Sequence, residues 1–363
     1  MMKAGGVKSG RQSNLDIVRI IALCSVLLMH GVENVWRIHP ADVASTPSLE
    51  RVFIFITYTL GRLGVPLFLF LTGYLMLGKR YKKNEILSFY KTKVMRLLMI
   101  ALIWVVIYYL QAILLRGWVI RVTDIVRQFT FTSDIIIAPH LWYMPVIIGI
   151  YLFIPFVSNA LLSIDKRVLK VLVTIALFHF FLIPTMNVII QARGSIGLVG
   201  RYELQYLGGM YGVMMVIGYL CRQYWTKINQ KLSLAKLIIY CLGSIIISII
   251  MHYWALYLKR YNYDMWYDSI FILLASVSLF IILLKIFNNQ RDSIMLTKIA
   301  ELTFGCYLVH YFFIYLIKLA VNKSMVGHFG LFGIMTIGPA IASLIIVHLA
   351  SKSKQLAFIF GVK

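Results

Sequence analysis

The chain has 363 residues, of which 61% are hydrophobic and only 13% are charged. Soluble domains are about 45–50% apolar and about 25% charged, so this composition excludes an ordinary water-soluble fold. The formal net charge of +23 does not indicate a nucleic-acid-binding surface, because the basic residues flank apolar segments and do not form one patch. The sequence therefore predicts a membrane-embedded protein with no nucleic acid among its partners.

Ten apolar segments follow one another along the chain. Crossing the roughly 30 Å hydrocarbon core takes about 20 helical residues at about 1.5 Å per residue. The segments cover residues 15–36, 52–77, 96–115, 140–162, 171–190, 204–220, 236–257, 267–287, 299–317 and 329–350. We therefore expect an all-α, polytopic bundle of about ten transmembrane helices, with residues 15–350 forming one membrane domain.

Lys and Arg are distributed unequally between alternate loops. With the N-terminus placed in the cytoplasm, the inner segments hold 23 of the 36 basic residues and the outer segments hold 11. Because cytoplasmic loops are enriched in Lys and Arg, this asymmetry predicts that both termini are cytoplasmic. Residues 1–14 and 351–363 are then short cytoplasmic tails.

The first segment carries Asp16, Arg19, His30 and Glu33. A charge near the bilayer centre costs about 2.5–3.5 kcal/mol, so an ionisable residue within a span is a functional hypothesis. At about 100° per residue, Arg19 and His30 lie on one face, about 16 Å apart along the axis. Asp16 and Glu33 are each three residues from one of them and can pair with it. Four such residues on one span favour function over the alternative of simple helix packing.

Arg62 is the second charged residue inside a predicted span. Pro66 follows four residues later, lacks a backbone N–H and should kink the helix. Irregular backbone at membrane depth is tolerated where it is buried in protein or lines a wet cavity. Arg62 therefore either lines a substrate-binding cavity or extends to the outer interface, and the sequence leaves both interpretations open.

Lys93 and Arg96 stand at the cytoplasmic start of the third segment. Residues three apart share a helix face, so two cations meet at the membrane surface, close to the basic run 79–83. This surface suits a polyanion, although basic residues that only anchor the span would give the same pattern.

Histidines and aromatic residues mark the later segments. His140 and Trp142 open the fourth segment from the outer side, where Trp can also belong to an interfacial aromatic belt. His310 lies within the ninth segment, where a buried structural histidine is the alternative. Eight Trp and Tyr residues in the outward-facing part of the sixth to eighth segments and their loops suit sugar rings or a membrane interface equally well; they are Tyr202, Tyr206, Tyr211, Trp254, Tyr261, Tyr263, Trp266 and Tyr267. The four cysteines lack metal-ligand spacing, so no metal site is expected.

Four of these motifs together resemble the acyltransferase-3 family of integral-membrane O-acyltransferases. Arg19 and His30 match the family's first signature, Arg and His separated by ten residues. Residues 65–75 are similar to the second signature, 140–155 to the fourth, and 303–310 to the late signature that ends in His. The matches occur in order and span most of the chain.

The resemblance implies a stand-alone, ten-helix, multi-pass enzyme of the bacterial inner (cytoplasmic) membrane. Such an enzyme transfers an acyl group, here expected to be acetyl, from cytoplasmic acyl-CoA as co-substrate to a hydroxyl of an extracytoplasmic cell-envelope glycan or glycolipid. The family's basic pair, commonly Arg-x-x-Arg and implicated in holding CoA, corresponds to Lys93 and Arg96. Lys93 keeps the charge but not the bidentate phosphate geometry. The implied partners are membrane lipid, acyl-CoA and the acceptor.

In this hypothesis His30 is the general base, Glu33 orients its ring, and Arg19 contacts CoA or the reacting oxygen. The acceptor is expected to bind at Arg62, His140, Trp142 and His310. A polar stripe through a helix bundle also describes a transporter or exporter of a glycan or lipid-linked sugar, and this is the alternative function.

Overall fold

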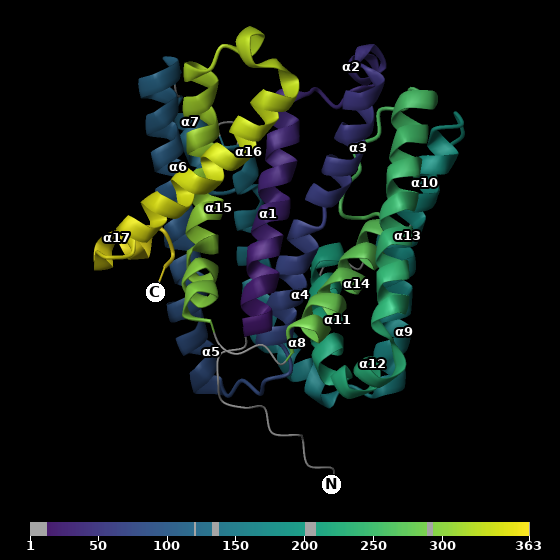
Figure 1. Ribbon diagram of the computed structural model, residues 1–363. Helices are drawn as coiled ribbons and strands as arrows, with labels where there is room; N and C mark the ends of the chain where they lie inside the picture. Colours follow the sequence, from purple (N-terminus) through teal and green to yellow (C-terminus); the bar gives the residue numbers. More distant parts are fainter. Residues whose placement is uncertain (1–12, 120, 133–137, 200–207, 289–292, 363) are drawn as a thin grey trace.

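The computed structural model describes residues 13–119, 121–132, 138–199, 208–288 and 293–362. Within these ranges the secondary structure is helical, with no strands, and the helices form a bundle (Figure 1). The prediction of an all-α, polytopic membrane protein is confirmed.

Eight helical runs within the described ranges are long and apolar enough to cross a membrane. They are α1 (Ser13–Val35), α3 and α4 (Ser48–Gly61, Gly64–Met76), α5, η1 and α6 (Lys83–Phe89, Tyr90–Val94, Met95–Arg116), η2 and α8 (Pro139–Trp142, Tyr143–Ser163), α9, η3 and α10 (Lys166–Leu177, Phe178–Leu182, Ile183–Gln191), α13 and η5 (Leu234–His252, Tyr253–Leu258), α15 (Ile294–Ala320) and α16 (Lys323–Ala350).

Two of the ten expected spans correspond to shorter helices, α11 (Gly209–Gln223) and α14 (Ile270–Ile286). The remaining described helices connect the long ones or follow them. They are α2 (Pro40–Ser45), α7 (Val122–Phe129), α12 (Trp225–Lys231) and α17 (Lys354–Ile359).

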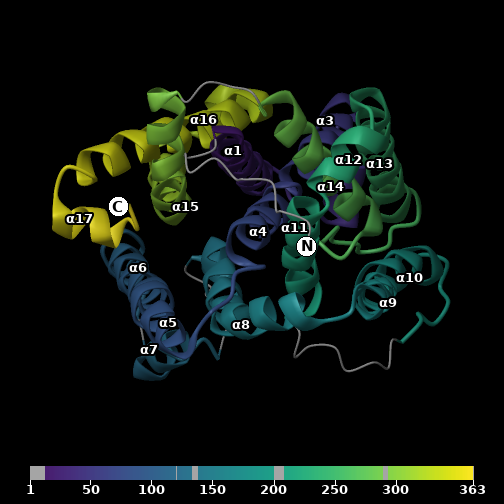
Figure 2. The ribbon, with the colours of Figure 1, turned by 90° about the horizontal axis from the view of Figure 1, so that it is seen from below.

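Helix α1 lies at the centre of the bundle, between α15 and α16 on one side and α3 and α4 on the other (Figures 1 and 2). The most apolar windows of α1 and of Ser48–Met76 are 67% and 72% buried, against 17% for Lys166–Gln191. The two spans that carry unexpected charges are therefore internal, whereas α9 and α10 present most of their surface outward.

The second span is broken at Arg62, as Pro66 predicts. The proline ring would collide with the carbonyl group four residues earlier, so α3 ends at Gly61 and α4 begins at Gly64. Both glycines lie against α1: a Cβ at Gly61 would lie 2.9 Å from the backbone of Met29. The absence of side chains lets the broken segment pack directly on the ionisable face of α1.

Helices α4 and α11 also approach backbone to backbone. Gly73 of α4 faces the carbonyl of Met215, and Gly218 of α11 faces the carbonyl of Phe70, leaving no room for a Cβ at either glycine. Small residues allow this closeness in membrane helix pairs.

The C-terminal segment is packed against the third span. Trp104 Nε1 of α6 donates a hydrogen bond to the carbonyl of Ile359 (2.9 Å), and Arg96 donates to the carbonyl of Val362 (2.8 Å). Helix α17 lies part-way along the bundle in Figure 1. Residues 1–12 of the expected N-terminal tail lie outside the described residues, and the cytoplasmic location of both termini stays a prediction.

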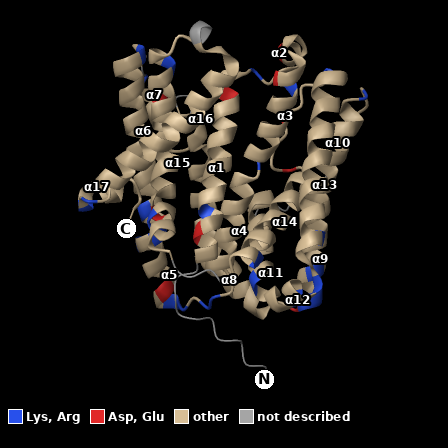
Figure 3. Cartoon of the chain, viewed as in Figure 1, with Lys and Arg blue, Asp and Glu red and all other residues tan. Residues whose placement is uncertain are grey.

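Basic residues gather at one end of the bundle, beside α5, α9 and α12, which is the lower end in Figure 3. Three of the segments that the Lys and Arg asymmetry assigns to the cytoplasm, 78–96, 163–170 and 221–236, have described helices at this end.

Candidate active site

A cavity of about 760 Å³ opens beside the C-terminal half of α1. Its walls come from α1, the break between α3 and α4, the start of α8, α15, and the segment before α14. Its volume lies in the range of small-molecule sites, roughly 300–1,000 Å³. Five residues that the sequence singles out line it, namely His30, Glu33, Arg62, His140 and Trp142.

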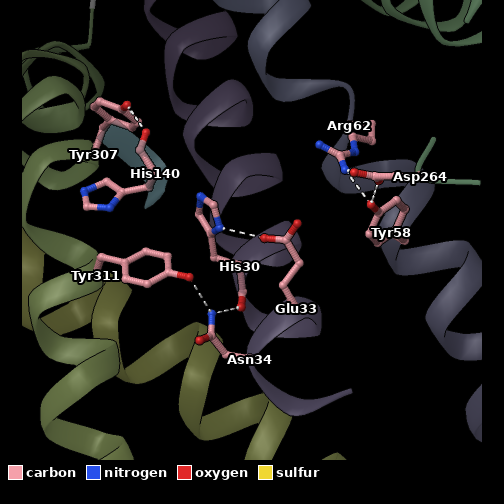
Figure 4. Close-up of polar contacts among 9 residues, drawn as sticks. All are labelled: His30, Glu33, Asn34, Tyr58, Arg62, His140, Asp264, Tyr307 and Tyr311. Carbon is pink, nitrogen blue, oxygen red and sulfur yellow. Dashed lines mark hydrogen bonds and ion pairs between the residues drawn. The ribbon is translucent and has the colours of Figure 1, made fainter. Parts of the chain in front are cut away.

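His30 and Glu33 form a pair at this cavity. His30 Nδ1 lies 3.0 Å from Glu33 Oε2, one helical turn further along α1 (Figure 4). A carboxylate only accepts hydrogen bonds, so Nδ1 is the donor in this contact. The His30 side chain is 13% exposed and lines the cavity. The arrangement is that of a general base oriented by a carboxylate.

Three histidine rings meet beside this pair. The His30 and His310 rings are stacked with centroids 5.2 Å apart, and His140 lies 4.9 Å from His310 and 6.3 Å from His30. His310 is fully buried behind His30 and is absent from the cavity lining. The structure thus brings together three histidines from three spans, although within the described ranges no group of His, Cys, Asp or Glu has the geometry to hold a metal ion.

Two tyrosines of α15 fix the position of His140. Tyr307 Oη donates to the backbone carbonyl of His140 (2.5 Å), and the Tyr311 ring stacks on the imidazole at 4.8 Å with planes 2° apart. Asn34 ties this wall to α1 by donating to the carbonyl of His30 (2.6 Å) and to Tyr311 Oη (3.3 Å). Asn34 and Tyr311 are not among the residues predicted from the sequence, and Tyr307 was included only as part of the segment 303–310; a polar residue one turn after His30 was the available signal for Asn34.

Arg62 is buried in the cavity wall, with 3% of its side chain exposed. It donates to Asp264 Oδ1 (2.8 Å) and to the hydroxyl of Tyr58, and it lies over the rings of Trp266 (4.6 Å) and Tyr267 (5.3 Å). The Arg62 side chain is therefore enclosed by protein groups of the cavity wall, and its role in binding a substrate stays a prediction. Figure 4 shows the Glu33 carboxylate between the His30 ring and the Arg62–Asp264 pair.

An aromatic wall faces the histidines. The Trp142 ring lies 5.2 Å from Trp266 and stacks on Tyr267 at 5.8 Å, and all three line the cavity. Trp266 Nε1 also donates to Tyr211 Oη (3.2 Å). Two of the eight aromatic residues considered for sugar binding, Tyr202 and Tyr206, lie outside the described residues.

Arg19 lies apart from this cavity. It forms an ion pair with Asp16, and Asp16 also accepts a hydrogen bond from Thr297 (3.3 Å). Along α1 the cavity lining begins at Val26 and does not include Arg19. The structure therefore brings His30 and Glu33 to the site, while a path shared with Arg19 stays a prediction.

The expected CoA-binding pair lies at the basic end of the bundle. Lys93 is exposed in the π-helical turn η1, whereas Arg96 is half-buried, donates to the carbonyl of Val362, and lies 5.9 Å from the Phe358 ring. One side of the Arg96 guanidinium is thus engaged by the C-terminal segment.

Lys93 belongs to a basic cluster that also contains Lys79 and Arg222. Burial, followed by the positive charges of Arg222 and Lys93, lowers the pKa of Lys79 below its ordinary value. Arg222 is held in place because it donates to the carbonyls of Tyr74 (2.8 Å) and Leu77 (2.6 Å) at the end of α4. We call Lys79, Lys93 and Arg222 the inner basic cluster.

Fold and site together define a multi-pass helical membrane protein with a histidine–carboxylate pair in a cavity. Residues 12–348 match the acyltransferase-3 family model, which describes an acyltransferase domain. The chain belongs to this family.

The chain is also similar to an amino-acid racemase of Enterococcus faecalis, at 22% identity over 321 residues. The match covers 83% of this chain and 40% of the racemase, so the chain spans well under two thirds of that relative. No solved structure matches the chain.

Proposed function

We propose that this protein transfers an acyl group, with acetyl as the expected one, from cytoplasmic acyl-CoA to a hydroxyl of an extracytoplasmic cell-envelope glycan or glycolipid, in the inner membrane of a bacterium. Family membership supports acyl transfer in general. The observation that carries the proposal is the His30–Glu33 pair at a 760 Å³ cavity that also has an aromatic wall.

In the proposed reaction His30 Nε2 removes the proton from the acceptor hydroxyl while that oxygen attacks the thioester carbonyl carbon. The tetrahedral intermediate collapses with cleavage of the C–S bond. The departing sulfur takes the proton from His30, so the products are the acyl ester and CoA thiol. Throughout the reaction the Glu33 carboxylate accepts a hydrogen bond from His30 Nδ1–H. Its negative charge stabilises the imidazolium that forms between the two proton transfers.

The other cavity residues bind the acceptor in this proposal. Trp142, Trp266 and Tyr267 offer aromatic faces suited to a sugar ring, and Arg62 lies among them with Asp264 fixing its orientation. His140 and His310 keep the His30 ring in position through their ring contacts. Arg19, on the same helix as His30, would contact the acyl-CoA donor as its pantetheine arm extends from the cytoplasmic surface toward His30.

The inner basic cluster is the proposed site for the CoA phosphates. Phosphate oxygens accept charge-assisted hydrogen bonds, which are about twice as strong as neutral ones. Burial lowers the pKa of Lys79, and the positive charges of Arg222 and Lys93 lower it further, so a bound phosphate would offset the repulsion among the three cations.

Replacing Lys79 and Lys93 together with Met is expected to raise the KM for acetyl-CoA by about a hundredfold, since each of the two lost charged contacts removes about 1.4 kcal/mol of binding free energy, a factor of about ten. The acceptor KM should not change. The matched control is the double replacement of Lys227 and Lys231, which are exposed at the same end of the bundle on α12. Equal KM values for both double variants would contradict the assigned phosphate site.

The function itself is tested with detergent-purified protein, radiolabelled acetyl-CoA and an extract of envelope glycans and glycolipids. An acyltransferase labels its acceptor without a sealed membrane. A transporter or exporter needs two compartments and leaves the extract unlabelled. Thermal unfolding shows whether the purified protein is folded. If folded protein leaves the extract unlabelled, the proposal is overturned.

A further inference from the structure

A second cavity, of about 340 Å³, runs along one side of α8. It is lined by one stripe of α8, by the first half of α11 and by Leu77 at the end of α4. Among the described lining residues, Tyr211 alone has a polar side-chain group, and its hydroxyl already accepts a hydrogen bond from Trp266. We call this apolar cavity the α8 groove.

The α8 groove adjoins the candidate active site. Pro145 lines both cavities, and the Tyr211–Trp266 hydrogen bond links a wall of one to a wall of the other. From Pro145 to Val157 the groove follows α8 for about 18 Å, close to the depth of one leaflet of a roughly 30 Å hydrocarbon core.

The groove contains empty space and is accessible from the lipid side of α8. A Cβ added at Gly149 would meet no other atom within 4 Å, so there is empty space beside this residue. Phe153 on the same stripe is 54% exposed, although it lies in a membrane-spanning segment, so this side of α8 faces lipid. A ligand could therefore enter sideways from the bilayer.

The chemistry of the lining selects a hydrocarbon chain. The pantetheine arm of CoA carries two amide groups, and burying them among apolar side chains without hydrogen-bond partners is unfavourable. A hydrocarbon chain has no such requirement and gains from burial against Gly149, Ile150 and Phe153.

The direction of the groove selects the source of that chain. The groove starts at the active-site cavity and runs along α8 away from it, toward Leu77 at the end of α4. A lipid of the outer leaflet has the same orientation, with its headgroup outward and its chain pointing toward the bilayer centre. A CoA thioester reaches the active-site cavity from the cytoplasmic side. To enter the groove from there, its acyl chain would have to turn back toward the side from which it came.

We propose that the α8 groove holds the hydrocarbon chain of a lipid-anchored acceptor, whose hydroxyl-bearing headgroup lies in the cavity beside His30. This inference rests on the proposed function and narrows its acceptor to a membrane lipid with a hydroxylated headgroup. The lipid enters between α8 and α11 without leaving the bilayer.

The test uses the full chain in nanodiscs and a hexadecyl glucoside that carries a photoreactive diazirine in its alkyl chain. We expect crosslinks on peptides that contain residues 145–157, and competition by unlabelled hexadecyl glucoside but not by palmitoyl-CoA. Gly149→Leu, which fills the groove, should lower this labelling by about tenfold. Gly243→Leu on α13 is the matched control, because a Cβ there also meets nothing within 4 Å and Gly243 lies outside the groove.

Two results would overturn the inference. Displacement of the probe by palmitoyl-CoA and not by hexadecyl glucoside would assign the groove to the donor's acyl chain. Equal labelling of the two glycine variants would mean that the probe samples the protein surface as ordinary surrounding lipid.

The labelling needs no acyl transfer, so this inference and the proposed function can fail separately. If the wild type is labelled on α8 but transfers no acetyl group, the proposed function fails and the lipid groove stands. If acetyl transfer occurs and α8 is not labelled, the groove inference fails alone.

Discussion

Replacing His30 with Gln is expected to lower kcat by about 10²–10⁴-fold, the usual contribution of a positioned general base. Gln keeps a similar size and can still face Glu33, but it has no lone pair of sufficient basicity to accept the hydroxyl proton. The KM for acetyl-CoA should change little, because the proposed phosphate site lies at the inner basic cluster. The measurement is steady-state acetyl transfer by purified protein.

His348→Gln is the control for this variant, since His348 is exposed near the end of α16. Equal thermal unfolding of the wild type and both variants would show that the membrane fold is intact. Near-normal turnover by His30→Gln would remove His30 from the chemistry and leave only a structural role for its pair with Glu33.

Replacing Asp264 with Asn is expected to destabilise the protein and to raise the KM for the acceptor. Removal of one partner from a buried ion pair typically costs about 3–5 kcal/mol, because the other charge is left uncompensated. Asp264 is 63% exposed and shares its charge with water, so we expect a smaller loss of about 2 kcal/mol. Arg62, only 3% exposed, would then be held by Tyr58 and the rings of Trp266 and Tyr267.

A double-mutant cycle distinguishes the loss of the Arg62–Asp264 interaction from a general destabilisation of the cavity wall. Arg62→Met combined with Asp264→Asn removes the buried charge together with its partner, and should recover part of the stability that Asp264→Asn alone loses. The measurement is thermal unfolding of the purified variants, with acceptor KM as the second readout. Strictly additive losses would mean that the two side chains act independently, contrary to the geometry.

The local part of the site could be predicted from the sequence. His30 and Glu33 are one helical turn apart, so a helix over this segment places them in contact whatever surrounds it. Pro66 likewise determines that the second span breaks near Arg62, since its effect reaches only four residues back. The spans themselves follow from length and apolar composition.

The partners from distant segments could not be predicted in this way. Asp264 lies 202 residues after Arg62, in a connection with no periodic pattern. Only the tertiary packing of this connection brings Asp264 close to Arg62. The stacking of Tyr311 on His140 likewise depends on which spans are neighbours. A single sequence gives the faces of each helix but not the order of helices around α1.

The inner basic surface shows the same division. The tertiary structure gives Lys93 and Arg96 different surroundings: the positive charge of Lys93 acts on Lys79, whereas Arg96 donates to the carbonyl of Val362. Binding of CoA phosphates by Lys93 and Arg96 together stays a prediction.

The interlocked backbones of α4 and α11 have a consequence for the whole reaction route. Helix α11 carries Arg222 toward its inner end and Tyr211 toward its outer end, so a shift in its register would displace both together. A methyl group at position 73 or 218 is enough to force such a shift, because neither site has space for it. Gly73 and Gly218 thus together fix the distance between the proposed binding site of the CoA phosphates and that of the acceptor.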